Sequence, residues 1–131
     1  MGHVKTFFLA ALTGGLTLAP MCLAQSSPAD DQLRFFATCA GRLSAQMEHQ
    51  WLFDGQASEQ TQRQRAGVIE LLEAIIPAGR GHEVLAWRIE AKQAQAVLLT
   101  RSTFVTDPRQ ARLARKLAVR RLGECRTLLL G

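Results

Sequence analysis

Apolar residues recur at intervals of three and four along four stretches of the chain, and each stretch predicts an amphipathic α-helix. The first helix is expected from Pro28 to about Leu52, with Ser27 as its N-cap and with Asp30 and Asp31 near the positive end of the helix dipole. Its apolar stripe consists of Leu33, Phe36, Ala40, Leu43, Met47 and Trp51.

A turn around Asp54 and Gly55 separates this helix from a second one, for which Ser58 is the expected N-cap. The second helix begins polar and becomes strongly apolar, and the segment Pro77 to Gly81 ends it. Its apolar half is formed by Val68, Ile69, Leu71, Leu72, Ile75 and Ile76.

The third predicted helix, from about His82 to about Thr100, is apolar on two sides. One stripe is Leu85, Ile89, Ala96 and Leu99; the other is Val84, Trp87, Ala91, Ala94 and Leu98, which alternates strictly between steps of three and four. The second stripe is a candidate interaction surface, because its alanines would let another helix come close. The alternative is that both stripes are internal, as in a helix wedged between two neighbours.

The fourth predicted helix begins after Asp107 and runs to about Leu129. Its apolar face is rich in alanine, and Arg121 projects within that face, where it needs a carboxylate partner or room to reach solvent. The opposite arc is a candidate basic contact face, formed by Arg109, Arg112, Arg115, Lys116, Arg120 and Arg126.

The predicted fold is all-α, because no strand signal interrupts these four stretches; Arg101 to Thr106 is short enough to be a linker. Four amphipathic helices with short connections predict a small antiparallel four-helix bundle with up-down-up-down topology.

The first 24 residues have the layout of a secretory signal peptide. Lys5 lies in a short positive segment, an uncharged apolar run follows, and Pro20 precedes the sequence Cys22-Leu23-Ala24. We expect cleavage between Ala24 and Gln25, a periplasmic or otherwise secreted protein, and a single helical domain over residues 25–131. The rival interpretations are a retained membrane anchor, which is short of the roughly 20 apolar residues a spanning helix needs, a lipoprotein acylated on Cys22, and a cytosolic protein with a buried first helix.

Cys39 and Cys125 remain after this cleavage, and in an oxidising compartment such a pair predicts one structural disulfide between the first and last helices. The chain-entropy model assigns a loop of this length about 4 to 5 kcal/mol. A redox-active pair would be expected to show the spacing Cys-x-x-Cys, which is absent from the sequence.

Charge is unevenly distributed. Lys5 is the only charged side chain before Gln25, so cleavage lowers the formal charge from +5 to +4. The segment from Arg101 to Arg126 contains eight basic residues and only two acidic ones, Asp107 and Glu124. An exported protein does not meet nucleic acid, so acidic protein surfaces and anionic lipid head groups are the candidate partners for this end, unless it is simply a solvated face.

No motif for catalysis, a cofactor or a metal is present in the sequence, so we expect no enzyme activity and no cofactor. Gly-x-Ser-x-Gly, His-Glu-x-x-His and Cys-x-x-Cys-His are all missing. His49 and His82 each adjoin a glutamate, but the predicted topology places them at opposite poles.

The favoured function is therefore a non-catalytic periplasmic binding or accessory protein that contacts another envelope protein or itself. The alternatives are a periplasmic holdase-type stress chaperone and an enzyme that uses scattered carboxylates.

Overall fold

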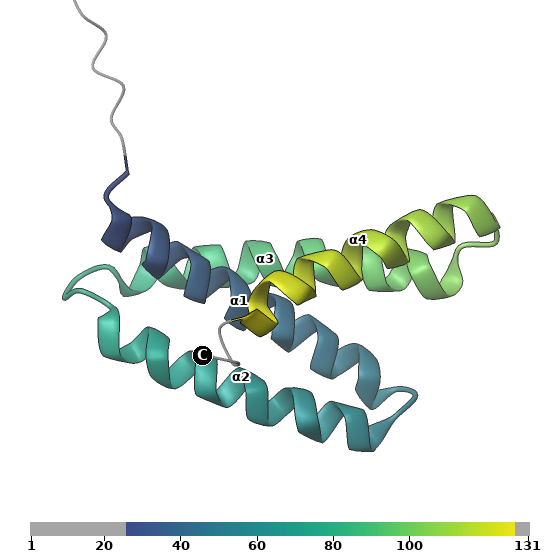
Figure 1. Cartoon of the computed structure of the whole chain (residues 1–131), viewed down its shortest axis with the longest axis horizontal. Helices are drawn as coiled ribbons and strands as arrows, with labels where there is room; N and C mark the ends of the chain where they lie inside the picture. The colour runs from purple at the N-terminus through teal and green to yellow at the C-terminus, as the bar shows by residue number, and fades with distance from the viewer. Residues whose placement is uncertain (1–25, 128–131) are drawn as a thin grey trace, which may run out of the picture.

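The computed structural model describes residues 26–127, which form four α-helices (Figure 1). The predicted signal peptide and its cleavage site, and the end of the fourth helix expected at Leu129, lie outside the described residues. The helices are α1 (Pro28–Trp51), α2 (Gly55–Ile75), α3 (Gly81–Phe104) and α4 (Pro108–Arg126). Successive helices run in opposite directions, which confirms the predicted all-α, up-down-up-down arrangement.

Helix α1 is the centre of the fold. It packs against α2 along one side and against α3 along another, whereas α4 packs mainly on α3 and meets α1 over a short stretch. Because α1 and α3 run in the same direction, their contact is the diagonal one of a regular bundle, yet it is the most extensive in the molecule. The structure is thus two helical hairpins joined through α1 and α3.

Gly41 permits this contact between α1 and α3. A Cβ atom on Gly41 would overlap the carbonyl oxygen of Arg88 and would lie 3.0 Å from the Cβ atom of Ala91. The two helix backbones therefore meet where neither carries a large side chain.

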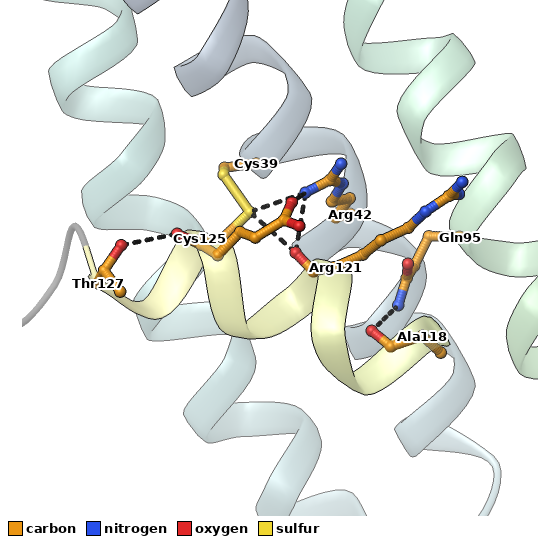
Figure 2. Close-up of a disulfide and its surroundings, with 8 residues drawn as sticks. Cys39, Arg42, Gln95, Ala118, Arg121, Cys125 and Thr127 are labelled. Carbon is orange, nitrogen blue, oxygen red and sulfur yellow. Dashed lines mark hydrogen bonds and ion pairs between the residues drawn. A yellow bond between two sulfur atoms is a disulfide. The ribbon is translucent and has the colours of Figure 1, made fainter. Parts of the chain in front are cut away.

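The core has two parts. The larger cluster contains Leu33, Phe36, Ala37, Cys39, Ala40, Leu43, Val68, Leu72, Val84, Leu122 and Cys125, and the smaller one joins Ala45, Leu99 and Ala118. The predicted disulfide between Cys39 and Cys125 is present, with a Cα–Cα distance of 5.4 Å, and links α1 to α4 (Figure 2).

Two predicted helix boundaries are wrong. Helix α2 begins at Gly55, because Asp54 is its N-cap and accepts a hydrogen bond from the Ala57 amide at 3.0 Å. Ser58 lies inside the helix and instead donates to the Met47 carbonyl of α1 at 2.9 Å. Helix α3 continues through Phe104, so the predicted linker after Thr100 is largely the last turn of that helix.

Candidate functional site

The interaction stripe predicted on the third helix, Val84, Trp87, Ala91, Ala94 and Leu98, is largely turned inward. Val84 is buried in the main core, and Ala91 lies at the contact with Gly41. Trp87 and Leu98 are partly buried against the two core clusters. Ala94 alone is exposed, and the partner of this stripe is chiefly α1.

The opposite stripe of α3 contains exposed residues. Leu85 and Ile89 are each about half exposed, whereas Leu99 is buried. Leu85 and Ile89 border a groove between α2 and α3 whose floor includes Gly41 and Ser44 of α1. Two-sided apolar character in α3 therefore reflects burial on one side and a partly open groove on the other.

The predicted basic contact face is fully exposed. Its members Arg109, Arg112, Arg115, Lys116, Arg120 and Arg126 all face solvent, and none forms an ion pair with a carboxylate of residues 26–127. Two exposed apolar side chains, Leu113 and Val119, also lie on the outer surface of α4.

A cluster that the sequence pattern did not reveal lies where α1 and α3 end. Trp51, Leu52, Phe53 and Phe104 are exposed by 75%, 70%, 61% and 62%, and we call these four residues the aromatic tip. The ring centroids of Phe53 and Phe104 are 6.4 Å apart, which joins the α1–α2 turn to the last residue of α3. The ring of His49 lies 5.2 Å from that of Phe53, and its Nε2 is 3.2 Å from the Thr103 hydroxyl.

The aromatic tip is exposed because of where the helices end. Trp51 continues the apolar spacing of α1, but it is the last residue of that helix and does not join the core. The turn between α1 and α2 and the turn between α3 and α4 lie at the same end of the molecule, on the right in Figure 1. A signal in the sequence was available: Trp51-Leu52-Phe53 is an apolar run that extends into a turn.

A second candidate site is a cavity of about 210 Å³ on the α4 side of the α1–α3 contact. Three arginines line it, Arg34 and Arg42 from α1 and Arg121 from α4, and we call it the arginine cavity. Trp87 and Glu90 of α3 form part of its wall.

Two arginine side chains lie close to the Trp87 ring. The guanidinium carbon of Arg34 is 5.4 Å from its centroid, and that of Arg80 is 5.6 Å away.

Arg42 ties this cavity to the disulfide region. Its Nη1 donates to the Arg121 carbonyl at 2.8 Å and to Glu124 Oε2 at 2.7 Å, and it lies 3.9 Å from Cys125 Sγ (Figure 2). Within Cys39-Ala40-Gly41-Arg42, three residues therefore join α1 to α3 or α4, and Ala40 is buried in the core.

No protein-family model, curated protein or solved structure matches the chain. The sites above are therefore assigned from their own geometry.

The two histidines of the helical region are far apart. His49 contacts Thr103 near the end of α3, and His82 lies in the first turn of the same helix. At 1.5 Å per residue these positions are separated by roughly 30 Å. Residues 26–127 contain no group of three histidine, cysteine, aspartate or glutamate side chains placed to hold a metal ion.

In that same part of the chain, no helix has the length and apolar character needed to cross a bilayer.

Proposed function

We propose that the chain is exported to the periplasm, is cleaved between Ala24 and Gln25, and acts there as a non-catalytic binding protein. Its contact surface is the aromatic tip, and its partner is another envelope protein. The observation that carries the proposal is the exposure of four large apolar side chains at one end of a domain whose other aromatic side chains, Phe35, Phe36 and Trp87, pack against the core.

The composition of the aromatic tip supports a protein partner. Tryptophan and phenylalanine are enriched in protein interfaces, where tryptophan is among the residues that carry most of the binding energy. Such side chains gain free energy when a partner pocket removes them from water. The tip is therefore suited to insert into an apolar pocket.

The positive charge beside the aromatic tip indicates what kind of protein surface the partner has. Helix α4 begins four residues after Phe104 and exposes Arg109 and Arg112 in its first turns. These cations favour a partner whose pocket has an acidic rim, since complementary charge speeds encounter and fixes orientation.

The test is site-specific photo-crosslinking in intact cells, with the crosslinker placed at position 53 and, as the matched control, at Leu85. Both positions are exposed and apolar, but Leu85 lies near the start of α3, away from the aromatic tip. We expect one discrete product from position 53, lost when Trp51 and Phe104 are replaced by alanine and weakened by Arg112→Glu.

Equal products from positions 53 and 85, or a product that survives the Trp51→Ala/Phe104→Ala substitution, would contradict the proposal. The mass of the crosslinked product distinguishes a second copy of this chain from a different protein. A holdase-type chaperone would instead give many products of different mass from position 53. It would also suppress client aggregation in a dose-dependent way.

A further inference from the structure

The arginine cavity contains more positive charge than its surroundings neutralise. Arg42 is paired with Glu124, and Glu90 is the one carboxylate in the cavity wall, so three guanidinium groups are balanced by two carboxylates. The guanidinium groups of Arg34 and Arg121 form no ion pair with any carboxylate of residues 26–127.

The position of Arg121 is unusual for a cation. It is half-buried on the inner side of α4, between the buried residues Ala118, Leu122 and Cys125. Its side chain leads away from the disulfide and past Gln95, as Figure 2 shows, and it lines the cavity. No nitrogen of its guanidinium is both buried and unpaired among residues 26–127, so the group can be reached from the cavity, where a charge-assisted hydrogen bond to an anion would stabilise this arrangement.

The cavity also offers an apolar wall. Trp87, Ala91 and Ala94 line it from α3, opposite the arginines of α1 and α4. A ligand that uses both features has a charged group for the arginines and an apolar part for the wall formed by Trp87, Ala91 and Ala94. The cavity volume of about 210 Å³ is below the roughly 300–1,000 Å³ of sites for drug-sized molecules, so the ligand is small.

The groove on the α2 side of the same contact provides a comparison. It has the same volume of about 210 Å³ and also contains cations. There, Lys92 is paired with Glu48 at 2.6 Å and Arg65 donates to the Ser44 hydroxyl at 2.7 Å, while Arg88 forms no ion pair with a carboxylate of residues 26–127. Both sites therefore contain arginines without a carboxylate partner, and the arginine cavity differs from the groove in having a tryptophan, Trp87, in its wall.

We propose that the arginine cavity binds a small organic oxyanion, a carboxylate or a phosphate monoester. Arg34 and Arg121 hold its charged group by charge-assisted hydrogen bonds, and its apolar part lies against Trp87. This site is separate from the aromatic tip and does not depend on the function proposed for it.

Trp87 gives a direct readout of binding. The whole chain has two tryptophans, so Trp51→Phe leaves Trp87 as the sole indole fluorophore. The purified Trp51→Phe protein is titrated with succinate and with phenyl phosphate, and with sodium chloride at matched ionic strength. We expect a saturable change in Trp87 emission with at least one of the two organic anions and none with chloride, together with a higher melting temperature in its presence.

Substitutions identify the residues responsible. Arg121→Gln should weaken binding by about tenfold or more, the loss expected when one charged hydrogen-bond partner is removed. Arg34→Gln should do the same, and because Arg34 is exposed this variant keeps the test available if Arg121→Gln unfolds. Arg112→Gln removes the same charge from the exposed face of α4 and should leave the affinity unchanged.

Two results would overturn the proposal. One is the absence of any saturable response, in emission and in melting temperature, to both organic anions. The other is an equal loss of affinity in Arg112→Gln and in the cavity variants, which would mean that the protein attracts anions only through its net charge.

Discussion

Gly41 of α1 lies against the carbonyl oxygen of Arg88 in α3, so closely that a Cβ atom at position 41 would overlap that oxygen. The overlap involves main chain and not the end of a flexible side chain, so a larger residue requires the two helices to separate. Since α1 contacts every other helix, separation at this point disturbs the whole fold.

Gly41→Ala should therefore destabilise the protein. Overpacking in a tight core costs about 1–3 kcal/mol, and the involvement of backbone places this site at the upper end. The measurement is the free energy of unfolding in urea.

The matched control is Gly67→Ala in α2, where an added Cβ atom meets nothing within 4 Å. In this helix interior alanine should stabilise by about 0.5–1 kcal/mol. If Gly41→Ala were as stable as the wild type, the close approach of α1 and α3 would be incorrect.

The periodicity of apolar residues predicted the four helices and their alternating directions, because amphipathic spacing and turn residues are local signals. It did not predict that α1 and α3 would form the main contact, since Gly41 is a small residue whose role depends on Arg88, 47 positions away. Helix ends were also missed: Ser58 resembles an N-cap in sequence, but Asp54 caps α2 and the Ser58 hydroxyl bonds to α1.

The candidate sites were predictable only in part. The basic face of α4 follows from spacing within one helix. The aromatic tip joins Phe53 to Phe104 and depends on two turns lying at the same end of the fold. The arginine cavity combines residues from three helices, and the sequence indicated only that Arg121 occupies an unexpected position on an apolar face.

The disulfide should provide much of the stability of this domain. Cys39 and Cys125 are 86 residues apart in sequence and both are fully buried. The double substitution Cys39→Ala/Cys125→Ala should lower the free energy of unfolding by about 4–5 kcal/mol, through the greater entropy of the unfolded chain. Urea denaturation of the wild type and the variant measures this difference.

Burial of both cysteines gives a second expectation for the same bond. Dithiothreitol should reduce it slowly in the folded wild type and rapidly once urea unfolds the chain. Rapid reduction without denaturant, or a double variant within 1 kcal/mol of the wild type, would contradict a buried structural disulfide.

Gln95 is a site where a polar side chain reduces stability. It is fully buried, its Nε2 donates to the Ala118 carbonyl at 3.2 Å, and its Oε1 has no hydrogen-bond donor within residues 26–127. Gln95→Leu removes the unpaired oxygen, while the Ala118 carbonyl keeps its bond within α4. We expect the free energy of unfolding to rise by about 1 kcal/mol.

Gln93→Leu is the control for Gln95→Leu, because Gln93 is an exposed residue of the same helix. Its substitution should change the stability by no more than a few tenths of a kcal/mol. A loss of stability in Gln95→Leu would show that the amide forms a further bond that contributes to the fold.

Asp30 makes stability depend on pH in the acid range. The hydrogen bond from the Arg80 side chain holds the pKa of the Asp30 carboxyl below its usual value, and the Ser27 hydroxyl, 2.8 Å from Oδ2, lowers that pKa further. The carboxyl of an unfolded chain has a pKa of about 3.9. Because folding lowers the pKa, the stabilisation is complete above that value and is lost as the pH falls through the folded pKa.

Asp30→Asn should therefore lower the melting temperature at pH 7, and its difference from the wild type should shrink below about pH 4. Asp31→Asn is the matched control, since Asp31 is also an acid in the first turn of α1 but has no ion pair with Arg80. Melting curves between pH 2 and pH 7 measure both differences. A deficit in Asp30→Asn that stays constant with pH, or that equals the deficit of Asp31→Asn throughout, would mean that the Arg80–Asp30 pair does not stabilise the junction of α1 with the start of α3.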